Sequence, residues 1–93
     1  MPYFVVIAYD ITDDKRRLTL ARELLNFGYR VQYSVFEAVL ERPTIQTLQT
    51  RIKEIIDQEE DSVRIYVLPL GIRDRILTLG VQREYQDPDV YVF

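Results

Sequence analysis

Charged residues capable of metal and phosphate chemistry follow one apolar stretch near the N-terminus. Residues 3–9 read YFVVIAY, Asp10 comes next, and DDKRR occupies residues 13–17. The chain has no histidine and no cysteine, which removes the usual general base and the imidazole and thiolate metal ligands. Carboxylates remain, and the divalent cofactor that carboxylates favour is Mg²⁺ or Mn²⁺.

Asp10 stands at the exit of a predicted strand. Alternation along residues 3–9 puts Asp10 on the same face as Val6 and Ala8. Two roles for the carboxylate are open. It can bind a metal ion at the strand end, where sheets often carry functional groups, or it can accept hydrogen bonds from the amides of residues 11–13, as turn aspartates commonly do.

Three consecutive bases, Lys15, Arg16 and Arg17, lie in the first turns of the helix predicted after this strand. Cations at a helix N-terminus oppose the helix dipole, so another interaction has to favour them. A phosphate backbone would do so, and the three bases would then form a cationic rim beside Asp10. The alternative is ion pairing with the acids of the same turn or with the acidic run 59–61.

Periodicity and turn residues divide the chain into alternating elements. The sequence predicts strand 3–9, a helix over 13–27 capped by Thr12 or Asp13 and stopped at Gly28, and strand structure over 29–41 with a turn or bulge near Tyr33 and Ser34. A helix opened by Pro43 that ends before 59–61 follows, then strand 62–70 and one or two short apolar strands within 75–80 and 89–93.

This order is β, α, β, β, α, β, which predicts an α+β ferredoxin-like domain with both helices on one face of an antiparallel sheet. At 93 residues and 47% hydrophobic composition, we expect one domain over 1–93 with its core in 1–70. The uncovered sheet face is apolar and predicts a homodimer. In such a pair, the two copies of Asp10 would share one ion.

Composition also bounds the compartment and the partners. The absence of cysteine favours a reducing compartment, and the first apolar run is too short for a signal peptide or a membrane span, so we expect a cytoplasmic protein without a membrane partner. A net charge of -3 confines any nucleic-acid surface to a local patch. Ten of the twelve basic residues are arginine, which suits bidentate phosphate contacts or ordinary ion pairs.

Two stretches, VVIAYDITDDKRR over 5–17 and RVQYSVFE over 30–37, resemble the signature of the small CRISPR-associated adaptation protein that partners the spacer integrase and is often described as an endoribonuclease. The similarity continues through residue 70. The resemblance implies a ferredoxin-like homodimer in which Asp10 is the Mg²⁺ or Mn²⁺ ligand with Tyr9 beside it. It also implies that residues 75–93 extend the sheet of the partner protomer.

The resemblance further matches motif positions Arg17, Ser34 and Phe36, and it moves Arg16 and Arg17 towards phosphate contacts, while Phe36 is predicted to be a core residue. Members of that family act as metal-dependent nucleases on single-stranded RNA or double-stranded DNA, or bridge integrase subunits around spacer DNA without catalysis.

Two functional classes therefore compete. In the first, the protein is an endonuclease in which Asp10 is catalytic and holds the metal, and Tyr9, Arg16, Arg17 and Ser34 contact the nucleic acid. In the second, the dimer is a scaffold that docks CRISPR integrase subunits and clamps duplex DNA through phosphates. A ferredoxin-like RNA-recognition module is disfavoured because no aromatic RNP-like motif lies on a strand. A small-molecule sensor is disfavoured because the chain has no glycine-rich phosphate loop.

Overall fold

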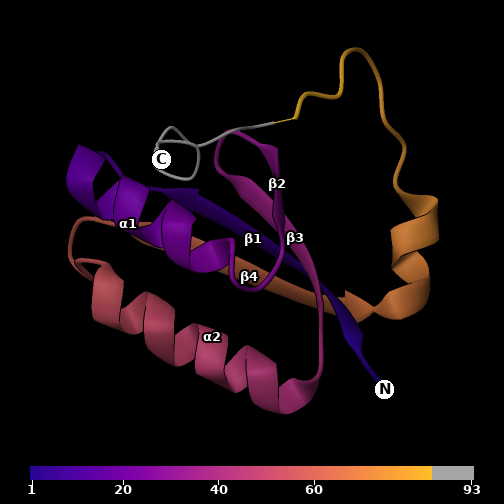
Figure 1. Cartoon of the computed structure of the whole chain (residues 1–93), viewed down its shortest axis with the longest axis horizontal. Helices are drawn as coiled ribbons and strands as arrows, with labels where there is room; N and C mark the ends of the chain where they lie inside the picture. Colours follow the sequence, from indigo (N-terminus) through magenta and orange to yellow (C-terminus); the bar gives the residue numbers. More distant parts are fainter. Residues whose placement is uncertain (85–93) are drawn as a thin grey trace, which may run out of the picture.

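The computed structural model describes residues 1–84. Its elements follow the order β1 (Tyr3–Asp10), α1 (Asp14–Leu24), β2 (Tyr29–Gln32), β3 (Val35–Leu40), α2 (Arg42–Ile55), β4 (Ser62–Pro69) and the 3₁₀ helix η1 (Leu70–Arg75). Figure 1 shows both helices on one side of the sheet. This is the expected ferredoxin-like α+β arrangement.

The sheet has the order β2-β3-β1-β4, so β1 is central and antiparallel to both neighbours. The pairing places Ile7 opposite Phe36 on β3 and opposite Ile65 on β4, which fixes the residues that share a face. β2 is an edge strand, and its register with β3 shifts between Arg30 and Gln32. The shift lies just before Tyr33 and Ser34, where the sequence predicts a turn or bulge and where the structure has the turn.

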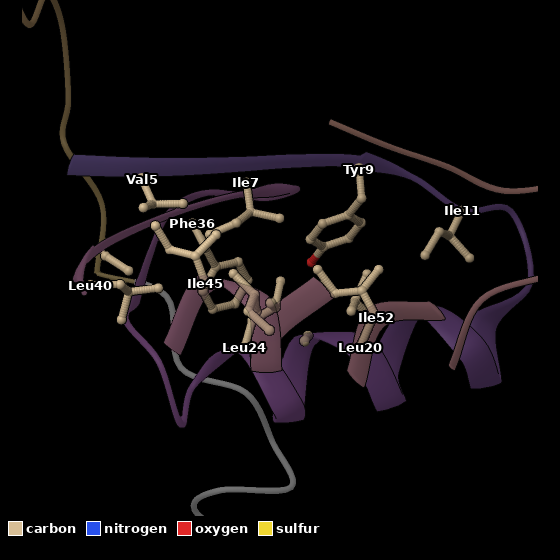
Figure 2. Packing of buried hydrophobic residues seen from close by; sticks show 13 residues of the cluster. Val5, Ile7, Tyr9, Ile11, Leu20, Leu24, Phe36, Leu40, Ile45 and Ile52 are labelled. Atoms are coloured by element: carbon tan, nitrogen blue, oxygen red, sulfur yellow. The ribbon is translucent and has the colours of Figure 1, made fainter. Parts of the chain in front are cut away.

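The core lies between the sheet and the two helices. Val5, Ile7 and Tyr9 of β1 point towards the helices (Figure 2) and belong to one buried cluster with residues of both helices. The buried residues of α1 and α2 recur at helical spacing: Leu20, Ala21, Leu24, Ile45, Leu48 and Ile52. Within residues 1–84, no helix is long and apolar enough to cross a membrane.

Local sequence signals set the element ends. The carboxylate of Asp13 caps α1 by accepting a hydrogen bond of 2.8 Å from the backbone N–H of Arg16. Pro43 lies at the start of α2, where its missing N–H costs nothing. Gly28 serves packing rather than a left-handed turn, because a Cβ built there would lie 2.1 Å from the carbonyl oxygen of Glu37. The loop after α1 therefore lies directly against β3.

The helix-free face of β1, which we call the open face, carries Phe4, Val6, Ala8 and Asp10. Phe4 is only 1% exposed, although it lies outside the buried cluster between the sheet and the helices. The 3₁₀ helix η1 contacts the strand that carries Phe4. Val39 on β3 and Tyr66 on β4 are both 40% exposed on the same face. An apolar surface thus remains uncovered beyond Phe4, as alternation along β1 and β3 predicted.

The C-terminal region departs from the prediction. Residues 70–75 form η1, and residues 76–84 form neither helix nor strand, so the strand expected within 75–80 is absent and that expectation is wrong for the single chain. Pro69 and Gly71 interrupt strand geometry at this point. The apolar side chains that follow are strongly exposed, with Leu77 at 91% and Leu79 at 92%. The second expected strand, within 89–93, lies outside the described residues.

Candidate functional site

Asp10 ends β1 with its side chain on the open face. It is exposed, and its strand partner is Ser62, the first residue of β4. Within residues 1–84 no hydrogen bond joins its carboxylate to the turn that follows, so the turn-capping alternative is not what this structure has. The cap of that turn comes from Asp13 instead. The carboxylate of Asp10 is therefore available to a ligand.

Tyr9 lies on the opposite face of the same strand. Its side chain is 6% exposed, and its ring points between the helices beside Leu20 and Ile52 (Figure 2). The hydroxyl donates to the backbone oxygen of Tyr33 at 3.4 Å and accepts from Nη2 of Arg30 at 3.3 Å. Strand alternation thus turns the ring of Tyr9 into the core, and its contact with a nucleic acid stays a prediction.

Arg16 pairs with the acidic run rather than pointing into solvent. Its guanidinium donates from Nε to Oδ2 of Asp61 at 2.8 Å and from Nη2 to Oδ1 at 3.2 Å, and it also reaches Glu60 at 3.3 Å. The side chain of Asp61 is fully buried, and its carboxylate accepts a further bond from the backbone N–H of Asp57. These hydrogen bonds, led by that from Arg16, hold the pKa of the Asp61 carboxyl below its usual value.

The same contact raises the pKa of the Arg16 guanidinium, mainly through the hydrogen bond to Asp61. The pair joins the first turn of α1 to the loop before β4, which are distant in sequence. Ion pairing, one of the two alternatives for the bases after Asp10, is thus what the structure has for Arg16. A phosphate would have to compete with a bidentate carboxylate for this side chain.

Arg17 closes the loop between β1 and α1. Its Nη1 donates to the backbone oxygens of Ile11 at 3.0 Å and Thr12 at 3.3 Å, and its Nη2 donates to the carboxylate of Asp14. The hydrogen bond to Asp14 is the main cause that raises the pKa of Arg17. Like Arg16, this residue has structural partners, and its contact with phosphate stays a prediction.

Ser34 lies in the turn between β2 and β3, half-buried, and is brought next to the end of β1. Its backbone oxygen accepts from the N–H of Tyr9 at 3.1 Å. The structure thus brings Ser34 to the same end of the sheet as Asp10, which the sequence separation of 24 residues did not reveal. Phe36, two residues further on, is 0% exposed, so its predicted role as a core residue is confirmed.

A basic residue on the open face, Arg64, was given no functional role by the sequence analysis. Arg64 is paired with Ala8, so it lies on the same face as Asp10 and one step along the face from it. Its guanidinium carbon lies 5.3 Å from the centre of the Tyr66 ring. The signal was present in the alternation of residues 62–69, but the basic run 15–17 drew the prediction to α1 instead.

Acidic residues do not gather around Asp10. Among residues 1–84 there is no group of three or more Asp, Glu, His or Cys side chains placed to hold a metal ion. Each chain therefore offers one carboxylate at this strand end. Mg²⁺ binds through one or two carboxylates while it keeps waters and takes substrate phosphate oxygens, so Asp10 fits half of such a site.

Fold and site together define a small ferredoxin-like protein that presents the carboxylate of Asp10 and a nearby arginine at one end of a helix-free sheet face. The family model described as CRISPR associated protein Cas2 matches residues 1–75. The chain belongs to the Cas2 family.

Relatives and solved structures agree with this assignment. A protein of Chloroflexus aurantiacus named CRISPR-associated endoribonuclease Cas2 3 is 40% identical over 92 residues, which is 99% of both chains. Cas2 of Streptococcus pyogenes has a TM-score of 0.75 at 33% identity, covering 83% of this chain and 99% of its own. A chain of a partial Cas6-RT-Cas1–Cas2 complex has a TM-score of 0.71 at 33% identity, covering 83% and 90%.

Proposed function

We propose that this protein is a CRISPR-associated endoribonuclease that uses Asp10 at the end of β1. The observation that carries the proposal is an exposed carboxylate on the open face, in a chain 40% identical to a protein named as an endoribonuclease. The bond to be broken is the phosphodiester of single-stranded RNA. Double-stranded DNA is the alternative substrate, and the cleavage assay below separates the two.

Asp10 would hold the divalent ion, Mg²⁺ or Mn²⁺, together with Asp10 of a second copy. A divalent ion held there supplies Lewis-acid stabilisation of phosphate charge and a water of lowered pKa. The chain itself places the carboxylate, because β1 is paired with β4 from Tyr3 through Asp10 and with β3 from Tyr3 through Ala8. Such rigidity matters, since a misplacement of about 1 Å at a reacting group can cost about 100-fold in rate.

A homodimer completes this site. The open face carries partly exposed apolar side chains such as Val39 and Tyr66 around the line of Val6, Ala8 and Asp10. Two copies related by a two-fold axis that pack through Val39 and the apolar residues beside it would bury apolar surface there and would bring the two carboxylates towards one another. The dimer thereby supplies the second ligand that no group of acidic residues within residues 1–84 supplies.

A second role, docking of Cas1 subunits, is favoured by a specific observation. One of the similar chains is part of a complex that contains Cas1, and this chain exposes Leu77, Leu79 and Val81 beyond its last helix. A series of exposed apolar side chains in one segment is suited to burial against a partner protein. In this role the protein is a scaffold in the capture of spacer DNA, and Asp10 is dispensable.

The decisive experiment is a cleavage assay with end-labelled single-stranded RNA and duplex DNA, in Mg²⁺, Mn²⁺ or EDTA. We expect metal-dependent cutting of RNA that Asp10→Ala removes. Asp74→Ala, which deletes an exposed aspartate of η1, is the matched control and should cut normally. Equal cutting by Asp10→Ala and the wild type would overturn the proposal. A wild-type protein that cuts neither substrate but still assembles with Cas1 would overturn it as well.

A further inference from the structure

Arg64 and Asp10 form a diagonal pair on the open face. β1 and β4 are antiparallel, with Asp10 opposite Ser62 and Ala8 opposite Arg64. Residues directly opposite share a face, so Arg64 lies diagonally from Asp10, at the separation of about 7–8 Å that is typical of such positions, with the two Cβ atoms somewhat closer. A phosphate group that approaches the carboxylate or an ion on it comes within reach of this guanidinium.

The surroundings of Arg64 differ from those of the other arginines near the site. Arg16 and Arg17 donate to carboxylates, and Arg30 lies against the Phe36 ring with Nη2 on the hydroxyl of Tyr9, on the helix side of the sheet. Among residues 1–84, Arg64 has no ion pair, and its contact is the face of Tyr66. Its five N–H donors thus remain available to an anion.

We propose that Arg64 binds the phosphate of the RNA strand beside Asp10, with its guanidinium held over the Tyr66 ring. The inference rests on the proposed endoribonuclease function and names the residue that recognises the substrate. A carboxylate repels a phosphate, so a site built on Asp10 gains from a cation beside the divalent ion that is charged at every working pH. Arginine supplies that charge in a planar fork that matches two phosphate oxygens.

Tyr66 gives the guanidinium a fixed position. The centre of its ring lies 5.3 Å from the guanidinium carbon of Arg64, and Tyr66 is two residues further along the same strand, on the same face. A cation over an aromatic face is attracted by the ring quadrupole and keeps its N–H groups free at the edge. The pair is therefore prepared for a planar, bidentate contact and loses little side-chain freedom when the phosphate arrives.

Binding and cleavage are measured separately on Arg64→Ala and Arg64→Lys. Binding of a labelled single-stranded RNA is followed by fluorescence anisotropy in EDTA, in an Asp10→Asn background, so that it depends on neither metal nor turnover. The matched control is Arg75→Ala, which removes an exposed arginine of η1. η1 follows Pro69, and Pro69 is paired with Tyr3 at the end of β1 far from Asp10. Light scattering and thermal melts accompany each variant.

We expect Arg64→Ala to weaken RNA binding about 10-fold and to lower the slope of log affinity against log salt by about 0.7, the contribution of one phosphate contact on a single strand. Cleavage by the same variant should lose about 10- to 100-fold in kcat/KM. Arg64→Lys should retain the salt slope and only part of the cleavage, because lysine keeps the charge without the fork. Arg75→Ala should match the wild type.

The outcomes separate this inference from the proposed function. If the wild type cuts RNA through Asp10 but Arg64→Ala leaves the RNA affinity and the salt slope unchanged, the phosphate role of Arg64 is overturned and the proposed function is kept. A wild type that neither binds nor cuts RNA overturns the proposed function and the inference with it. An Arg64→Ala protein that becomes monomeric or melts early assigns Arg64 to assembly, and that result also overturns the inference.

Discussion

Tyr9 and Asp10 are consecutive residues that lie on opposite faces of the same strand. The Tyr9 ring is 6% exposed and packs among the helix residues, whereas Asp10 is exposed on the open face. The Tyr9 hydroxyl is bonded to the backbone of Tyr33 and to Arg30. The packing of Tyr9 in the core therefore fixes the backbone at the end of β1, one residue before Asp10, whose side chain faces the other way.

Removal of the Tyr9 hydroxyl should affect stability more than chemistry. We expect Tyr9→Phe to lower the free energy of unfolding by about 1 kcal/mol, since the bonds to Tyr33 and Arg30 are lost. Its kcat on RNA should stay within about threefold of the wild type. Tyr9→Ala should lose about 3–5 kcal/mol, as large-to-small core substitutions do. Urea unfolding and initial cleavage rates measure both quantities.

A Tyr9→Phe protein of normal stability whose kcat falls as far as that of Asp10→Ala would contradict this assignment. That result would place the hydroxyl at the reacting phosphate instead of in the core.

Gly28 should tolerate no side chain. A Cβ there would meet the Glu37 carbonyl oxygen at 2.1 Å and the Cβ of Ala38 at 2.8 Å, and backbone atoms cannot move aside as a flexible side chain does. We expect Gly28→Ala to destabilise the protein by about 1–3 kcal/mol through overpacking. Gly71→Ala is the matched control, since a Cβ there has nothing within 4 Å. Thermal melts that rank the two variants equally would refute the close approach.

The Arg16–Asp61 pair should make stability depend on pH. The pKa of Asp61 is lowered in the folded protein, chiefly by the hydrogen bond from Arg16. A carboxyl whose pKa is lowered by folding stabilises the protein above its unfolded value, about 3.9. That stabilisation is lost as the pH falls through the lower folded value. Asp61→Asn should therefore be less stable than the wild type near neutral pH.

The difference between the two proteins should shrink as the solution is acidified below about pH 4. Urea unfolding of both proteins at several pH values measures it, with Glu59→Gln as a control because Glu59 is exposed and has no ion pair among residues 1–84. A gap of constant size across this range would mean that the charge of Asp61 contributes nothing.

The fold could be predicted because its signals are local and agree with one another. Alternation in β1 and β3, helical spacing of the residues from Ile45 to Ile52, and the cap at Asp13 all correspond to elements in the structure. The β2–β3 turn was found without Gly or Pro because the alternation breaks at Tyr33 and Ser34. The prediction of a strand within 75–80 was wrong for the single chain. An apolar run indicates that its side chains are to be buried, but it does not say whether the same chain or another one buries them.

The site was harder to predict because it depends on contacts between distant segments. The partner of Arg16 is 45 residues away in the chain, and only folding shows that Asp61 occupies its guanidinium. For Tyr9, alternation along β1 by itself indicates a ring on the face opposite Asp10, whereas the family resemblance predicts a contact with nucleic acid, which stays a prediction. The position of Arg64 beside Asp10 depends on the β1–β4 register, which the sequence does not contain.

Subunit mixing tests whether two copies of Asp10 share one site. If a single ion needs both carboxylates, a dimer with one Asp10→Ala chain is inactive, and activity follows the square of the wild-type fraction. An equal mixture, allowed to exchange subunits, should then keep about one quarter of the cleavage rate. Each chain offers one carboxylate at this end, and no acidic group of three supports it within residues 1–84. A linear fall, with about one half retained, would mean that each chain cuts on its own.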